Sequence, residues 1–121
     1  MKYPSLPHAH DVQADLEPIE SGLRQAERFE TVAELFKQLS DTTRLRIFWL
    51  LCHTEQCVIN ISALMEMSSP AVSHHLRVLR SCGLIVNRRE GKEVYYRAAD
   101  NPQVQLLHKT IEQVMAIACP E

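Results

Sequence analysis

The sequence predicts a mainly α-helical fold that carries one small β-hairpin, and three observations predict it. Apolar residues recur at spacings of three and four over most of the 121 residues. Residues 60–80 contain a short helical segment, a tight turn and a second helical segment with a serine-rich start. Two β-prone segments joined by a glycine turn follow directly at residues 84–96. This order of elements is typical of a winged helix-turn-helix.

Length and composition exclude several classes of protein. The chain is long enough for one domain with a core, and 45% apolar and 23% charged residues are typical of a globular protein. No apolar run approaches the roughly 20 residues of a membrane span, and the N-terminus lacks a signal-peptide core. We therefore expect a cytoplasmic protein with no membrane partner. In that compartment cysteines are more often thiols or metal ligands than disulfides.

Charge is distributed unevenly along the chain, although the net charge is only −2. Residues 11–41 carry eight acidic and three basic side chains, whereas residues 70–97 carry six basic and two acidic ones. Such asymmetry is typical of a protein that presents one basic face to phosphates.

The N-terminal region predicts an arm and a helix. Residues 1–18 contain three prolines and no sustained periodicity, so we expect a flexible arm ahead of a domain over residues 19–121. The arm carries His8, His10 and Asp11, which are either idle or metal ligands. Residues 19–39 then predict one amphipathic helix.

Asp41 can cap a second helix from Thr42 to about His53, with Trp49 expected in the core. A brief third helix starts at Asn60 or Ser62.

The helix that follows is expected to enter DNA. Serines precede it, and Pro70 is expected at its first helical position, where a missing N–H costs nothing. One side carries an apolar stripe of Val72, Leu76 and Leu79. The other side carries short hydroxyls, an imidazole and guanidiniums, which suit a major groove: Ser69, Ser73, His74, Arg77 and Arg80. An ordinary amphipathic helix with a solvated face is the alternative.

The predicted wing begins after Gly83, which suits a left-handed C-cap. Residues 84–86 and 94–96 predict two strands, and residues 88–92 predict the turn. Arg88, Arg89 and Lys92 would place positive charge at this tip, along the DNA backbone or in the minor groove.

The last predicted helix begins at Pro102 and has apolar residues in heptad-like spacing through Ala118. Such an apolar terminal helix needs a partner surface, and a second copy of the chain would place two recognition helices one DNA turn apart. Packing within one protomer is the competing interpretation.

The sequence resembles the ArsR/SmtB family of small winged-helix repressors, which sense metals or thiol chemistry. The resemblance lies in residues 39–47, 69–80, 83–86 and 89–96. The resemblance implies a homodimer formed by the first and last helices, bound to an imperfect palindromic operator in double-stranded DNA. It also implies release by an inducer. By the match in the recognition helix, Ser73, His74 and Arg77 would contact bases or adjacent phosphates.

The resemblance also suggests where a metal inducer would bind. The family's Cys-Val-Cys-Asp run corresponds here to residues 57–60, of which only Cys57 keeps a thiol. Family members complete this site from the arm, here His8, His10 and Asp11, and Cys52 and His53 lie close in sequence. Such a donor set suits Zn(II), Cd(II) or another thiophilic divalent ion.

Other inducer sites of the family match less well. The site on the last helix is expected to be lost, because Pro102 replaces one histidine and His108 has the wrong spacing. Cys82 lacks its partner cysteine, because Val78 stands there. A sensor of reactive sulfur or oxidants that uses Cys52 and Cys119 is the alternative to a metal sensor.

No feature of the sequence predicts an enzyme. Neighbouring residues on a helix point about 100° apart, so Cys52 and His53 cannot readily act as nucleophile and base. Neither a glycine-rich phosphate loop nor a pair of catalytic acids occurs.

Overall fold

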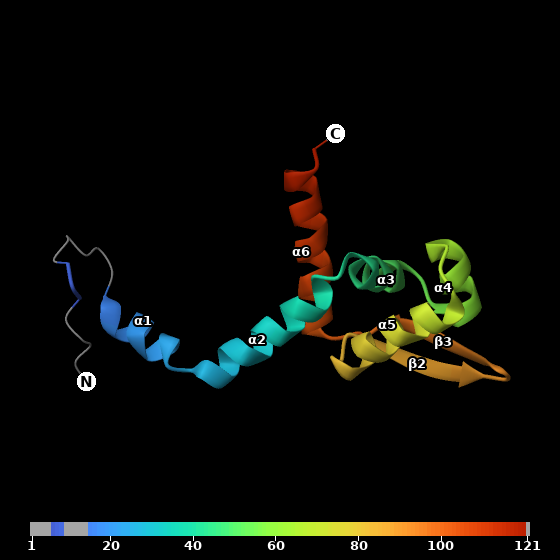
Figure 1. The fold of residues 1–121 in the computed structure, drawn as a ribbon, viewed down its shortest axis with the longest axis horizontal. Helices are drawn as coiled ribbons and strands as arrows, with labels where there is room; N and C mark the ends of the chain where they lie inside the picture. The colour runs from blue at the N-terminus through green and yellow to red at the C-terminus, as the bar shows by residue number, and fades with distance from the viewer. Residues whose placement is uncertain (1–5, 9–14, 121) are drawn as a thin grey trace. The chain divides into compact units, whose positions relative to one another are not determined.

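A computed structural model describes residues 6–8 and 15–120 of the chain (Figure 1). The chain divides into two units, Met1–Phe36 and Lys37–Glu121. None of the described helices is long and apolar enough to cross a membrane.

The first unit holds α1 (Leu16–Leu23) and most of α2 (Ala26–Leu39). The prediction of one helix over residues 19–39 was therefore wrong. The chain turns at Arg24 and Gln25, whose N–H groups donate to the carbonyls of Ser21 and Gly22 at 3.3 and 3.1 Å. Gly22 favours the break, because glycine is among the poorest helix formers.

Helix α1 begins at Leu16, three residues before the expected start of the helix at residue 19. The Asp15 carboxylate caps it by accepting from the N–H of Glu17 at 3.1 Å. Pro18 lies in the first turn, where a helix tolerates proline.

The second unit is a winged helix-turn-helix. Its elements are α3 (Thr42–His53), β1 (Gln56–Cys57), α4 (Val58–Met65), α5 (Ser69–Ser81), β2 (Ile85–Glu90), β3 (Glu93–Ala98) and α6 (Pro102–Ala118). The three strands form an antiparallel sheet in the order β1-β3-β2, with Cys57 opposite Tyr95. Strand β1 was not predicted from the sequence, because two residues are too few to show a strand pattern.

The turn between α4 and α5 is held by local hydrogen bonds. Glu66 adopts a left-handed conformation (φ 54°), and the Met67 N–H donates to the Ser62 carbonyl at 3.0 Å. The Ser62 and Ser69 hydroxyls lie 3.1 Å apart and join the two helices. Ser68, one of the two serines that could cap α5, accepts from the Ala71 N–H, and Pro70 is the second residue of the helix rather than the expected first.

The core lies where α3, α4, α5 and the sheet meet. The predicted stripe of α5 is buried, and it packs with apolar side chains of the other elements: Val72, Leu76, Leu79, Ile47, Phe48, Leu51, Ile61, Leu84 and Ile85. Trp49 is 36% exposed, so its assignment to the core was wrong. Helix α6 buries Val104 at its start, whereas Leu106, Val114, Met115 and Ile117 are exposed.

The wing differs from the prediction in its length. Strands β2 and β3 pair from Ile85 with Ala98 to Glu90 with Glu93, so only Gly91 and Lys92 form the tip. Gly91 has a φ of 63°, which an L side chain rarely adopts. Arg88 and Arg89 therefore lie within β2 and not in the turn.

Candidate nucleic-acid interface and histidine cluster

The solvent side of α5 carries most of the predicted DNA contacts. Ser69, His74 and Arg77 are exposed and Ser73 is half-buried, while the apolar stripe on the opposite side is buried. The N-cap at Ser68 and the Ser62–Ser69 contact hold the start of the helix against α4. This arrangement leaves the His74 imidazole and the Arg77 guanidinium exposed, where they can meet base edges and phosphates.

His75, the residue after His74, is half-buried, and its buried Nδ1 has no hydrogen-bond partner among the described residues. Burial lowers its pKa, although the charge of Asp41 opposes that shift. Among the two adjacent histidines of α5, only His74 is exposed.

The three basic residues that were predicted at the tip of the wing, Arg88, Arg89 and Lys92, have different surroundings. The Arg88 guanidinium donates to Glu55 at 2.7 Å and to Glu90 at 2.6 Å, and it lies 4.8 Å from the centre of the Tyr95 ring. The hydrogen bonds that Arg88 donates to Glu55 and, with smaller effect, to Glu90 raise the pKa of Arg88. In the described part of the chain, Arg89 and Lys92 are exposed and take part in no ion pair. Arg88 is thus neutralised within the protomer, while the other two remain available to an outside anion.

The metal ligands predicted from the sequence are not brought together by the described residues. His10 and Asp11 lie outside those residues, and His8 belongs to a different unit from Cys57. Cys57 is only 8% exposed and precedes α4 without a side-chain capping bond. Cys52 is half-buried on α3, and burial followed by the charge of Glu112 raises its pKa to about 11.

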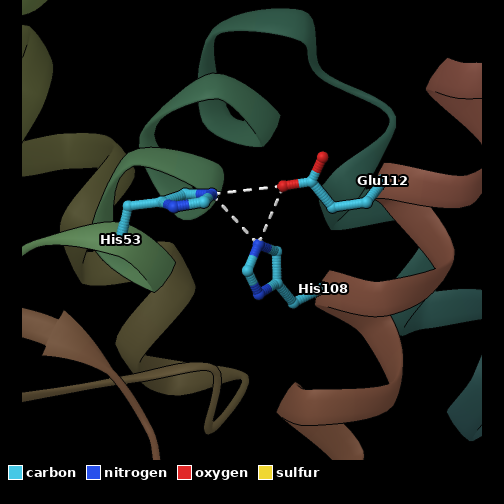
Figure 2. Close-up of side chains that lie close together, drawn as sticks. All are labelled: His53, His108 and Glu112. Carbon is cyan, nitrogen blue, oxygen red and sulfur yellow. Dashed lines mark hydrogen bonds and ion pairs between the residues drawn. The ribbon is translucent and has the colours of Figure 1, made fainter.

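His53, in contrast, meets two side chains of α6 (Figure 2). Its Nε2 lies 3.1 Å from His108 Nε2 and 3.2 Å from Glu112 Oε1, and His108 Nε2 lies 3.2 Å from the same oxygen. These three residues form the only group of three or more His, Cys, Asp or Glu side chains with converging ligand atoms among residues 6–8 and 15–120.

Trp49 supports this cluster from the preceding turn of α3. Its indole N–H donates to Glu112 Oε1 at 3.1 Å, and its ring lies 4.3 Å from that of His53. The hydrogen bond from Trp49 is the largest cause of a lowered pKa at Glu112. The polar end of the indole explains why Trp49 lies at the rim of the structure and not in the core.

Sequence reasoning missed this cluster. His108 was judged only against the family's spacing on the last helix, although His108 and Glu112 are four residues apart and must share a helix face. That spacing was a usable signal. The sequence holds no such signal for His53, because its contact with His108 and Glu112 depends on how α3 packs beside α6.

The two cysteines of the thiol alternative are both free. Cys52 lies close enough to Glu112 for that charge to affect it. Cys119 follows α6, seven residues after Glu112, which corresponds to about 10 Å of helical rise.

Comparison with known proteins identifies the family. Residues 41–86 match the model of the bacterial regulatory proteins of the arsR family. A transcriptional repressor SmtB homolog of Synechocystis is 38% identical over 90% of this chain and 80% of its own length. The chain belongs to the ArsR/SmtB family. It is a DNA-binding transcriptional regulator, as its winged helix-turn-helix and family membership show.

Two further ArsR/SmtB relatives are informative. The cadmium resistance transcriptional regulatory protein CadC homolog of Staphylococcus aureus is 43% identical over 64% of this chain and 65% of its own length. A homodimeric winged helix-turn-helix DNA-binding domain from Mycobacterium bovis, described as a possible ArsR-family regulator, has a TM-score of 0.69 and 36% identity. That likeness covers 81% of this chain and 89% of the other.

Proposed function

We propose that the protein is a homodimeric repressor that binds an imperfect palindromic operator and is released by a divalent metal ion such as Zn(II) or Cd(II). The observation that carries the DNA-binding part is the position of Ser69, His74 and Arg77 on the exposed side of a helix whose opposite side is buried. Free cationic groups at Arg89 and Lys92 on the wing add sequence-independent attraction to phosphates.

The homodimer is supported by apolar surface on two helices. Phe29, Val32 and Phe36 of α2 are exposed, as are the apolar residues of α6 named above. Large exposed apolar patches mark interaction surfaces in soluble proteins. The M. bovis domain of similar fold is described as homodimeric.

The metal inducer is supported by the relatives, one of which is named for cadmium resistance. The sequence-predicted site, Cys57 with His8, His10 and Asp11 of the arm, stays a prediction. Cys57→Ser tests it: loss of tight Zn(II) binding in this variant, with folding intact, would support a ligand role for Cys57. A thiol switch through Cys52 and Cys119 is the weaker candidate, because the raised pKa of Cys52 leaves little reactive thiolate at neutral pH.

Operator binding is tested with the full chain and a random-sequence duplex library. We expect selection to enrich a sequence with twofold symmetry. In fluorescence anisotropy with that duplex, Arg77→Glu should weaken binding at least tenfold, because it replaces attraction to DNA by repulsion. Lys109→Glu on α6 has the same change in charge and serves as the matched control. Equal affinity of Arg77→Glu and wild type would contradict the assignment of α5 as the recognition helix.

A further inference from the structure

We propose that His53, His108 and Glu112 form a binding site for a tetrahedral divalent ion of the Zn(II) class within each protomer. This site is distinct from the predicted one at Cys57. It also differs from the family arrangement on the last helix that the sequence lacks, because one of its three ligands comes from α3.

The three ligand atoms form a triangle of about the size that a tetrahedral Zn(II) ion requires. The three ligand atoms, His53 Nε2, His108 Nε2 and Glu112 Oε1, are separated by 3.1, 3.2 and 3.2 Å. Ligands about 2.05 Å from a tetrahedral Zn(II) ion lie about 3.3 Å from one another. The observed triangle therefore matches three corners of that tetrahedron to within about 0.2 Å.

The proton positions on the two imidazoles and the charge of the cluster also favour a bound cation. Two neutral imidazoles that face each other through Nε2 need one to donate and one to accept, and both lie beside the same carboxylate oxygen (Figure 2). A single cation between the three atoms would use one lone pair from each, with both imidazoles carrying their proton on Nδ1. With neutral histidines the cluster has a net charge of −1, which favours a cation over an anion.

The three ligands are held in place by α3, by α6 and by the Trp49 indole. His108 and Glu112 are one turn apart on α6, and His53 is the last residue of α3. The Trp49 indole donates to Glu112 Oε1 and orients the carboxylate, as outer-shell hydrogen bonds do in metal sites. The edge of the His53 ring packs against that of His108 at 4.7 Å between ring centres.

Solvent can reach the three side chains of the cluster. A cleft of about 340 Å³ is lined by both histidines, together with Cys52 and Asp100. The side chains of His53, His108 and Glu112 are 43%, 29% and 45% exposed. A water molecule can therefore reach the fourth corner of the tetrahedron, which three protein ligands leave open.

The site joins the end of α3 to the middle of α6, so a bound ion would tie these two helices together. A role for this tie in releasing DNA rests on the proposed function, whereas ion binding itself does not. The two can therefore fail separately: a protein that binds the ion here but no selected duplex would overturn the repressor and leave the site intact.

The test is a titration of the full-length, reduced protein with Co(II), followed by Zn(II) competition against a chromophoric chelator. We expect the visible absorption of tetrahedral Co(II) in wild type and at least a 100-fold loss of Zn(II) affinity in His108→Ala. Trp49→Phe, which removes only the outer-shell donor, should lose about tenfold. His74→Ala on α5 is the matched control and should retain wild-type affinity for Zn(II). Far-UV circular dichroism without metal checks that each variant folds.

Three results would overturn the proposal. One is unchanged Zn(II) affinity in both His108→Ala and Glu112→Gln. Another is complete loss of Zn(II) binding in Cys57→Ser with a thiolate-to-Co(II) charge-transfer band in wild type, which would assign the ion to the Cys57 site instead. The third is that the wild-type protein binds neither Co(II) nor Zn(II).

Discussion

The wing offers a quantitative test, because three arginine and lysine side chains that look equivalent in the sequence are not equivalent in the structure. Arg88 is paired with Glu55 and Glu90, whereas Arg89 and Lys92 take part in no ion pair within the described residues. Each phosphate neutralised on duplex DNA contributes about 0.9 to the slope of log affinity against log salt. One such contact makes affinity fall by a further factor of about 3.5 between 50 and 200 mM salt.

We therefore expect Arg89→Gln and Lys92→Gln each to reduce the salt slope by about 0.9, and the double variant by about 1.8. Arg88→Gln should leave the slope nearly unchanged, because its charge is already balanced within the protomer. The assay is fluorescence anisotropy with a selected duplex at four salt concentrations. A slope that falls as much in Arg88→Gln as in Arg89→Gln would refute the inference that the Glu55 and Glu90 pairs remove Arg88 from the interface.

Two further predictions concern stability. Leu79→Ala removes a fully buried side chain of α5 and should lower the free energy of unfolding by about 2–5 kcal/mol in urea titrations. Leu64→Ala, at an exposed position, should lower it far less. Equal losses in the two variants would contradict the assigned core. Asp41→Ala removes the cap of α3 and should cost about 1 kcal/mol at neutral pH, while Asp41→Asn retains most of the cap. The hydrogen bond from the Arg44 N–H lowers the pKa of Asp41 below 3.8, so its contribution is present above that pH and is lost as pH falls through the lowered value. An advantage of wild type over Asp41→Ala that persists unchanged at pH 2 would be inconsistent with this cap.

The recognition helix could be predicted from the sequence because its signals are local. A serine cap, an early proline, three stripe residues and a glycine after the last turn all lie within about 16 residues, and the structure places α5 at Ser69–Ser81 with Gly83 at a φ of 73°. The break before α2 was missed because the apolar spacing continues across Gly22, and the periodicity outweighed its poor helix propensity.

The features that sequence reasoning missed depend on contacts between distant residues. Arg88 was predicted in the turn, but it lies in β2 opposite Tyr95. Its guanidinium donates to Glu55, which is 33 residues earlier in the chain. Trp49 looked like a core residue because it is large and apolar, but its N–H donates to Glu112, 63 residues away. The histidine cluster likewise needs α3 beside α6, which no spacing within one helix can show.

We propose that a metal ion controls the affinity of this regulator for DNA. The most direct measurement is the anisotropy of a selected duplex, titrated with reduced full-length protein with and without stoichiometric Zn(II), after metal loading has been verified. We predict at least a tenfold loss of affinity on loading, a coupling of about 1.4 kcal/mol or more. The same affinity for protein with and without bound Zn(II) would contradict the claim.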